Sequence, residues 1–518
     1  MSKLTDRAVF ILVAAIAFAA RVPFAVSHFR LYPDAIAYLN IARNLAKGEG
    51  FTSTLKLNYF CPSDVAHCAL EDWPPLYPAA AGAVLWLARS ELALQVCNAL
   101  LIGVCAGLVF LIGSRLFDRA SGFAAGMFAC IAPSLFRAGT TAMSDALGLA
   151  LALAAIVAAL SAAGSGVRWA GAGALAGAAY LARYPNAIAM LALAAYAYVG
   201  VARRRMALWL AAGFVAAAGP VLAWKWAVYG SPLHATQLMH YNTLSYGAAA
   251  WSLPPGGWQA DHIWFVEALP QIGAAILSNT AAYLASVVGG AGGLYLLSLG
   301  AVGLVVTQGR SVLQNGRGLA LSIAALNFAA HAATWSLPPT QAPRFLLLTV
   351  SLLLPFCAAG LVGALRSGNR FVGAAAVAVC IAVTIRWGQA NMAAAAGRMW
   401  QYTPRQVAVA RGLCADLPAG TTVATNSPWL ISYSTGLPTA TLPHRLDRAK
   451  LARFVRRYGV DALVLMPGGA RGSRYGQKAY DGSLNTIPQI VQKLPTMHSP
   501  RMMPRKKGSA RLYSLRPP

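Results

Sequence analysis

Long apolar runs separated by polar connections fill the first 395 residues of the chain. Runs such as AVFILVAAIAFAA, LGLALALAAIVAAL and FLLLTVSLLLPFCAAGLVGAL approach or reach the roughly 20 residues that a helix needs to cross a bilayer. A transmembrane barrel would show short segments of alternating polarity, and the first 400 residues do not alternate. The pattern predicts an α-helical multi-pass membrane protein with about eleven spans.

The polar connections predict how the spans are oriented. We expect span one over about 8–27, an outer loop over 28–90 with short surface helices, and span two over about 92–113. Arg21 and Pro23 follow the first apolar run without a small-x-small cleavage site, so we interpret this run as a retained span. Short arginine-bearing connections then alternate on the cytoplasmic side, as the positive-inside rule requires, and the N-terminus is expected in the cytoplasm of a bacterial-type inner membrane.

Carboxylates follow the same division. Only Asp6 and Asp118 fall inside in this scheme. The other acidic residues before position 395 fall outside: Asp34, Glu49, Asp64, Glu71, Asp72, Glu91, Asp145, Asp261 and Glu267. Acid chemistry, if the protein performs any, therefore belongs to the outer face.

Two further segments lie outside the spans. An outer loop over 229–287 contains SPLH and WSLPPGGW, and beyond about 395 the strand-like runs TTVATN, TATLP, DALVLM and ARLYSL alternate with the helix-like DRAKLARFVRRYG. We therefore divide the chain into a membrane part, 1–395, and a small soluble α/β domain, 396–518. An odd number of spans places this domain outside, where its 19 Lys and Arg against 4 carboxylates would meet phosphate-bearing lipid.

Composition agrees with a bilayer as the main solvent, since 58% of residues are hydrophobic and 11% are charged. A formal net charge of +27 would suggest nucleic acid in a soluble protein, but in a membrane chain it favours anionic lipid as the partner and not nucleic acid. The chain has no Walker motif or Gly-rich nucleotide loop, which disfavours an ATP-driven pump or a nucleotide-sugar enzyme.

Candidate chemistry begins directly after span one, in HFRLYPDAIAYLNIARNLAKGEGF. Asp34 stands where a helix can start, near its positive end, and Tyr38 shares a face with the residues one turn on. The alternative is that Asp34 only caps this helix. Downstream, the prolines of EDWPPLYP predict a rigid segment before another apolar helix. Tyr77 in this segment is a second candidate for the donor or acceptor pocket.

These two segments resemble the GT-C superfamily of integral-membrane glycosyltransferases. The resemblance rests on P-D-A-x-x-Y, A-x-x-L-x-x-G-x-G-F and P-P-L-Y-P, and its relatives include protein O-mannosyltransferases and the aminoarabinose and galacturonic acid transferases. It implies a polyprenyl-phosphate sugar donor, an inverting transfer, and an essential acidic residue that maps to Asp34, with Asp145 similar to a second acid. Ala35 follows Asp34, so the family's double acid, a simple two-carboxylate motif, is missing. The sequence therefore identifies no certain cofactor, and it leaves a divalent metal open but weakly supported.

The chemistry of sugar transfer asks for cations as well, because a phosphate leaves as the acceptor attacks. Arg344 in PPTQAPRFLLL, Arg183 in ARYPN and Lys225 are the candidates for binding the donor phosphate, and the alternative for each arginine is an interfacial anchor. His234 and His240 could add acid, base or metal roles, although lone histidines are more often simple hydrogen-bonding residues.

Cys61 and Cys68 are the only cysteines that look like a pair. On the outer side, a disulfide that closes the loop PSDVAH is favoured over a zinc site built with His67.

The sequence thus favours a glycosyltransferase that uses a lipid-linked sugar on a glycolipid or lipopolysaccharide, cell-wall glycan or protein acceptor. A multi-pass transporter or lipid flippase is the alternative, although transporters keep ionisable groups near the bilayer midplane. The third interpretation is a non-enzymatic scaffold protein in which Asp34 merely caps a helix. The sequence identifies neither the sugar nor the acceptor.

Overall fold

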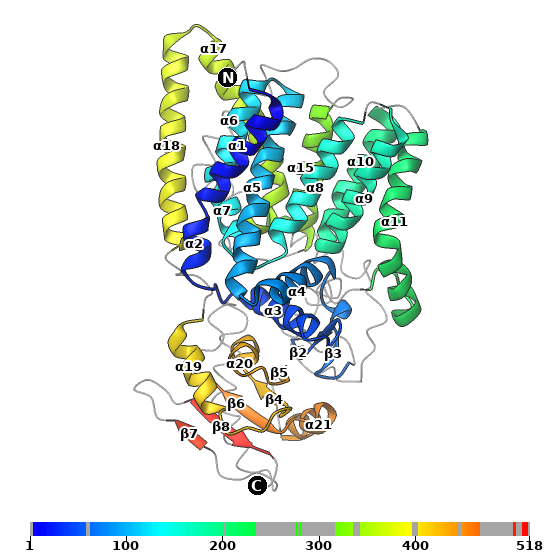
Figure 1. Cartoon of the computed structure of the whole chain (residues 1–518), viewed down its shortest axis with the longest axis vertical. Coiled ribbons are helices and arrows are strands. Elements are labelled where there is room, and N and C mark those ends of the chain that lie inside the picture. Colours follow the sequence, from blue (N-terminus) through cyan, green and yellow to red (C-terminus); the bar gives the residue numbers. More distant parts are fainter. Residues whose placement is uncertain are drawn as a thin grey trace.

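The computed structural model describes residues 4–57, 63–162, 164–200, 204–234, 276–277, 279–281, 316–334, 342–395, 402–443, 448–466, 501–503 and 510–515. Figure 1 shows a helical bundle at one end of the molecule and a small sheet flanked by helices at the other, with α3 and α4 between them.

Helices from both halves of the chain build the bundle. They are α1 (Asp6–Ala19), α2 (Val22–Ser27), α5 (Glu91–Leu116), α6 (Arg119–Ile131), α7 (Pro133–Gly139), α8 (Asp145–Leu160), α9 (Gly166–Ala182), α10 (Ala187–Ala195), α11 (Arg204–Tyr229), α15 (Gly316–Thr334), α17 (Leu347–Arg366) and α18 (Arg370–Ala395). Three short helical segments accompany them: η2 (Tyr184–Asn186), η3 (Tyr196–Gly200) and α16 (Ala342–Phe345).

Several of these helices suit a membrane. Among the described residues, 5 helices are long and apolar enough to cross a bilayer, or 6 if the bent pair α6 and α7 counts as one span. The expected first two spans coincide with Asp6–Ser27 and Glu91–Leu116. The chain is therefore membrane-embedded, while the expected total of eleven spans stays a prediction.

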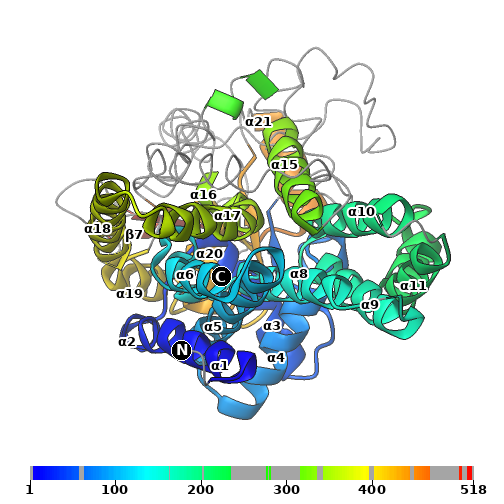
Figure 2. The same cartoon turned by 90° about the horizontal axis from the view of Figure 1, so that it is seen from above.

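Figure 2 shows α11 and α18 at opposite edges of the bundle. Only 22% of the span in α11 and 17% of that in α18 is buried, so both present apolar side chains outward, as lipid-facing helices do. Toward the interior, α11 packs closely on α9: a Cβ at Gly173 would stand 1.9 Å from the carbonyl oxygen of Leu210. Small residues that let helix backbones touch drive association where lipid removes the hydrophobic force.

A buried arginine joins two breaks in the bundle. Arg21, fully buried between α1 and α2, donates to the carbonyl oxygens of Ala17 at 2.6 Å, Ala129 at 3.3 Å and Leu135 at 3.5 Å. The last two acceptors lie on either side of the 61° bend between α6 and α7. Because a bend exposes carbonyl groups that the helix no longer satisfies, this guanidinium stabilises both breaks.

The segment between α2 and α5 packs beneath the bundle (Figure 1). It contains α3 (Pro33–Ala46), β1 (Thr52–Ser53), β2 (Leu55–Lys56), β3 (His67–Cys68), η1 (Ala69–Glu71) and α4 (Leu76–Ala88). Pro33 at the first helical position suits the start of α3, and α3 packs along α4 through Tyr38, Leu39 and Tyr77.

Beyond residue 402, strands and helices alternate as α19 (Pro404–Leu413), β4 (Val423–Thr425), α20 (Pro428–Thr435), β5 (Thr439–Thr441), α21 (Arg448–Tyr458), β6 (Ala462–Leu465), β7 (Arg501–Met503) and β8 (Ala510–Ser514). The sheet order is β2-β5-β4-β6-β8-β7, with parallel pairs from β2 to β6 and antiparallel pairs from β6 to β7. Alternate residues face α21 on one side and α19 with α20 on the other.

One edge strand of this sheet comes from the segment after α3. Leu55 pairs in parallel with Thr439, and the Thr439 amide donates to the Thr54 carbonyl at 2.8 Å. Asn40 on α3 also donates to Ser432 on α20 at 3.3 Å. The C-terminal sheet is therefore held directly against α3.

Candidate active site

Four charged side chains from separate parts of the chain meet where the bundle contacts α3. Arg344 of α16 donates from Nη1 to Asp34 Oδ2 at 2.6 Å and from Nε to Asp145 Oδ2 at 3.1 Å and Oδ1 at 3.3 Å. Arg183, just after α9, also donates to Asp145 Oδ1. The two carboxylates and two of the three cations expected from the sequence thus form one cluster, in which Arg344 bridges both acids.

The two carboxylates differ in access. The side chain of Asp145 is 0% exposed, whereas that of Asp34 is 33% exposed and that of Arg344 is 20% exposed. Burial acts to lower the pKa of Arg344, but the carboxylates of Asp145 and Asp34 outweigh it and raise the pKa, so the guanidinium stays charged. Nη2 of Arg344 makes no hydrogen bond with the described residues, which leaves a donor for an anion.

Asp34 does not cap its helix. The cap position of α3 is Tyr32, which makes no side-chain cap hydrogen bond, and Asp34 lies in the first turn behind Pro33. Its carboxylate still gains from the positive end of α3, but its hydrogen bond goes to Arg344.

Two amide side chains on α5 position the starts of both acid-bearing helices. Gln95, fully buried, accepts at 2.8 Å from the amide of Arg30, just before α3, and donates at 2.7 Å to the carbonyl of Ala25 in α2. Asn98, one turn on, donates to the carbonyls of Thr141 at 2.6 Å and Met143 at 2.8 Å, just before α8. Sequence reasoning missed both residues, although two amides three positions apart in the apolar run ELALQVCNALLIGV were a usable signal.

Aromatic side chains line the side of the charged cluster that faces α3. The Tyr38 ring lies 4.7 Å from that of Trp73 and 5.0 Å from that of Tyr77, and its hydroxyl shares a 2.8 Å hydrogen bond with Ser144, next to Asp145. Burial raises the pKa of both tyrosine hydroxyls above the usual range, so they remain neutral hydrogen-bonding groups. Trp73 and Ser144 were not anticipated from the sequence.

Lys225, the third expected cation, occupies a neighbouring position. Its Nζ donates to the Tyr184 hydroxyl at 2.5 Å and to the His234 carbonyl at 2.7 Å, and the residue is 1% exposed. His234 therefore contacts Lys225 through its backbone, while its ring stacks on Tyr229. Tyr184 in turn reaches the Trp73 carbonyl at 3.4 Å, which connects Lys225 to these aromatic side chains. His240 lies outside the described residues.

Potential metal ligands near these residues are engaged in ion pairs with protein side chains. In the described ranges, no three His, Cys, Asp or Glu side chains are grouped as metal ligands, and Arg344 occupies the space between the two acids. His67, which sequence reasoning considered as a ligand, pairs with Asp72 at 2.7 Å. Burial lowers the pKa of His67, but the bond to Asp72 raises it on balance. Cys61 lies outside the described residues, so its pairing with Cys68 stays a prediction.

Comparison with known proteins adds a family match. Residues 72–224 match the family described as dolichyl-phosphate-mannose-protein mannosyltransferase. This range includes Asp145 and Arg183 but ends before Arg344. No curated protein sequence matches the chain.

Solved structures match over most of the chain. ArnT from Cupriavidus metallidurans, in the apo state, is 12% identical with a TM-score of 0.61, and the match covers 98% of each chain. The oligosaccharyltransferase of Archaeoglobus fulgidus, tethered with an acceptor peptide, is 11% identical with a TM-score of 0.61, covering 89% of this chain and 68% of that one. The arabinofuranosyltransferase AftD from Mycobacteria is 14% identical with a TM-score of 0.56, covering 99% of this chain and 40% of that one.

Proposed function

The chain has the fold of the GT-C glycosyltransferases, and from this fold we propose that it transfers a sugar from a polyprenyl-phosphate donor to an acceptor outside the membrane. Two similar proteins support the donor class: ArnT has been solved bound to undecaprenyl phosphate, and the archaeal oligosaccharyltransferase in complex with an inhibitory peptide and a dolichol-phosphate. The observation that carries the proposal is the accessible carboxylate of Asp34 beside Arg344 at the start of α3.

Asp34 is the reacting carboxylate in this proposal. An acceptor hydroxyl or amine attacks the anomeric carbon, its proton passes to Asp34, and the bond from that carbon to the phosphate oxygen breaks with the electron pair leaving on phosphate. Attack opposite the leaving group inverts the anomeric centre. Asp145 acts as a positioning residue, because its side chain is fully enclosed between Arg344 and Arg183.

Arg344 and Arg183 stabilise the leaving phosphate. Arg344 keeps Nη2 uncommitted and a fifth of its side chain exposed, and Arg183 is 15% exposed. Preorganised cations of this kind stabilise charge that develops in the transition state without further reorganisation. We assign Lys225 to the donor side, because it binds Tyr184 beside the aromatic side chains, and we assign Tyr38, Tyr77 and His234 to the binding of donor or acceptor.

We propose an orientation that the same geometry supports. Asp6 pairs with Arg119 and Asp118 with Arg366, and these residues stand at the starts of α1 and α6 and at the end of α17. Figure 1 shows these helix ends at the end of the bundle away from α3. We place this end in the cytoplasm and α3 outside, in a bacterial inner membrane crossed about eleven times. The C-terminal residues 396–518 are then an extracytoplasmic α/β domain, joined to α3 through β2.

A deletion strain tests the function directly. Glycolipids, lipopolysaccharide, cell-wall glycan and glycoproteins are profiled beside the parent strain and beside the deletion carrying the wild-type gene. We expect one sugar to disappear from one acceptor and to return on complementation, which identifies both. An unchanged profile, together with flux of an unmodified lipid into proteoliposomes, would contradict transfer and support the transporter alternative.

A further inference from the structure

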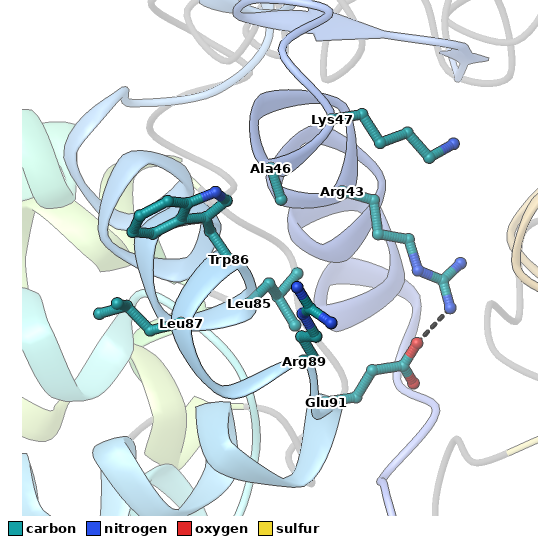
Figure 3. A pocket seen from close by; sticks show the side chains of 8 residues that line it. All are labelled: Arg43, Ala46, Lys47, Leu85, Trp86, Leu87, Arg89 and Glu91. Atoms are coloured by element: carbon teal, nitrogen blue, oxygen red, sulfur yellow. Dashed lines mark hydrogen bonds and ion pairs between the residues drawn. The ribbon is translucent and has the colours of Figure 1, made fainter.

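A hollow of about 850 Å³ opens where the C-terminal ends of α3 and α4 meet the start of α5 (Figure 3). Its size lies within the roughly 300–1,000 Å³ of small-molecule sites. Its lining is Arg43, Ala46, Lys47, Leu85, Trp86, Leu87, Arg89 and Glu91. Asp34 lies at the opposite end of α3, so this hollow is not the proposed active site.

In the proposed orientation, the hollow lies at the outer boundary between lipid and water. Glu91 begins a 26-residue apolar helix that is long enough to cross a bilayer. Just before it, Trp86 is 68% exposed and Leu87 is 73% exposed. Exposed apolar side chains beside the outer start of a span belong in acyl chains, and tryptophan is typical of this depth.

The polar half of the hollow is cationic. Its one carboxylate, Glu91, is bound by Arg43, so the pair is neutral and Lys47 and Arg89 supply net positive charge (Figure 3). Lys47 is 4.0 Å from Glu49 with both side chains more than half exposed, which is a weak pair. Arg89 makes no ion pair with the described residues.

Arg89 also adopts an unusual backbone conformation. With φ of 49° and ψ of 28°, it ends α4 in the left-handed region, where it is the only residue other than glycine among those described. Glycine fits this position without the steric cost that an arginine meets. An arginine kept where glycine would suit the backbone better points to use of its side chain.

We propose that this hollow binds the head group of an anionic membrane phospholipid of the outer leaflet. Lys47 and Arg89 contact the phosphate, and Trp86 and Leu87 contact the first part of the acyl chains. Apolar and cationic groups at one boundary match a lipid, since a soluble anion has no part that would cover the two exposed apolar side chains.

Lipid retention by the purified full chain tests this site without any sugar transfer, so its outcome is independent of the proposed function. Phosphatidylglycerol and phosphatidylcholine are added at equal concentration, and the bound lipid is measured by native mass spectrometry. The test variant carries Lys47→Gln and Arg89→Gly, which removes both charges and keeps a residue suited to the left-handed conformation. Arg405→Gln, at an exposed position on α19, is the matched control.

We expect the wild-type chain and the control to retain phosphatidylglycerol over phosphatidylcholine, and the double variant to lose about 25-fold in phosphatidylglycerol retention, roughly fivefold per cation. Each single variant should lose roughly fivefold in phosphatidylglycerol retention, so the single variants test the proposal even if the double variant unfolds. Equal retention of phosphatidylglycerol by the variant and control would overturn the proposal. So would full displacement by inorganic phosphate at equal concentration, because the apolar half would then contribute nothing.

Discussion

Aspartate–arginine pairs stand at both ends of the bundle, and the two ends use them differently. At the end away from α3, Arg366 binds Asp118 at 2.5 Å with side chains 60% and 42% exposed. Asp118 also caps α6, since its carboxylate accepts from the Ser121 amide at 2.8 Å. At the α3 end, Arg344 is bound by two aspartates, one of them fully enclosed.

The contrast shows what a merely structural aspartate looks like in this molecule. Asp118 caps its helix, shares one exposed arginine and sits in water, where such a pair is worth about 0–1 kcal/mol. Asp34 caps nothing and is held by an arginine that a second carboxylate also holds. Enclosing such charges costs free energy unless they are well paired, so their retention in one place favours a chemical use.

The largest expected effect comes from the same substitution made at each end. Asp34→Asn removes the proposed proton acceptor and should lower sugar transfer by about 10²–10⁴-fold, while Asp118→Asn, which keeps a good helix cap, should leave transfer near that of wild type. Complementation of the deletion strain, with sugar on the acceptor quantified, measures both. Transfer by Asp34→Asn at the wild-type level would end the assignment of Asp34.

Asp145→Asn should act on stability first. It leaves Arg344 and Arg183 without their shared, enclosed carboxylate, and breaking buried pairs of this kind costs about 3–5 kcal/mol. Thermal unfolding in detergent should therefore show a clear fall for Asp145→Asn and a much smaller one for Asp34→Asn. Equal falls would mean that the two acids share one structural role, and the division between reacting and positioning carboxylate would be wrong.

The sequence predicts the local features of this fold better than its long-range contacts. Apolar runs long enough to span a bilayer predicted the first two spans, because hydrocarbon thickness fixes helix length. The helical start at Pro33 and Asp34 was equally local. In contrast, Pro133 marks the 61° bend between α6 and α7 locally, but the hydrogen bonds that Arg21 donates on either side of the bend come from far away in the chain, and no local pattern predicts them.

The site shows the same limit. Asp34 and Asp145 were selected through the resemblance to the GT-C superfamily, and Arg183 and Arg344 because a leaving phosphate needs cations beside the acid. That Arg344 lies between both acids depends on the packing of α3, α8 and α16, which a single sequence does not reveal. Strand β2 was missed because two residues carry no periodicity, and its partner β5 lies in the C-terminal part of the chain.

Asn98→Leu tests whether uncharged groups at the α3 end set the carboxylate geometry. It removes the donors to the Thr141 and Met143 carbonyls just before Asp145, and a shift of about 1 Å there should lower the transfer rate at saturating donor by roughly 10–100-fold. Asn391→Leu is the matched control, because it removes a 2.9 Å bond to the Ile131 carbonyl elsewhere in the bundle. Both should lose about 1–3 kcal/mol of stability. If both lost the rate equally, the effect would be general loosening of the bundle.

The smallest expected effect is the acid dependence of the exposed pair. Burial acts to raise the pKa of Asp118, but the hydrogen bonds from Ser121 and Arg366 lower it on balance. A carboxylate with a lowered folded-state pKa adds stability above its unfolded pKa of about 3.9, and loses it as the pH falls through the folded value. Wild type should therefore exceed Asp118→Asn in unfolding free energy by less than about 1 kcal/mol at neutral pH, and the two should converge in acid. A larger difference that persists in acid would mean that this exposed pair stabilises the fold as much as the pairs around Arg344 do. The exposure of the side chains would then not explain the contrast between the two ends of the bundle.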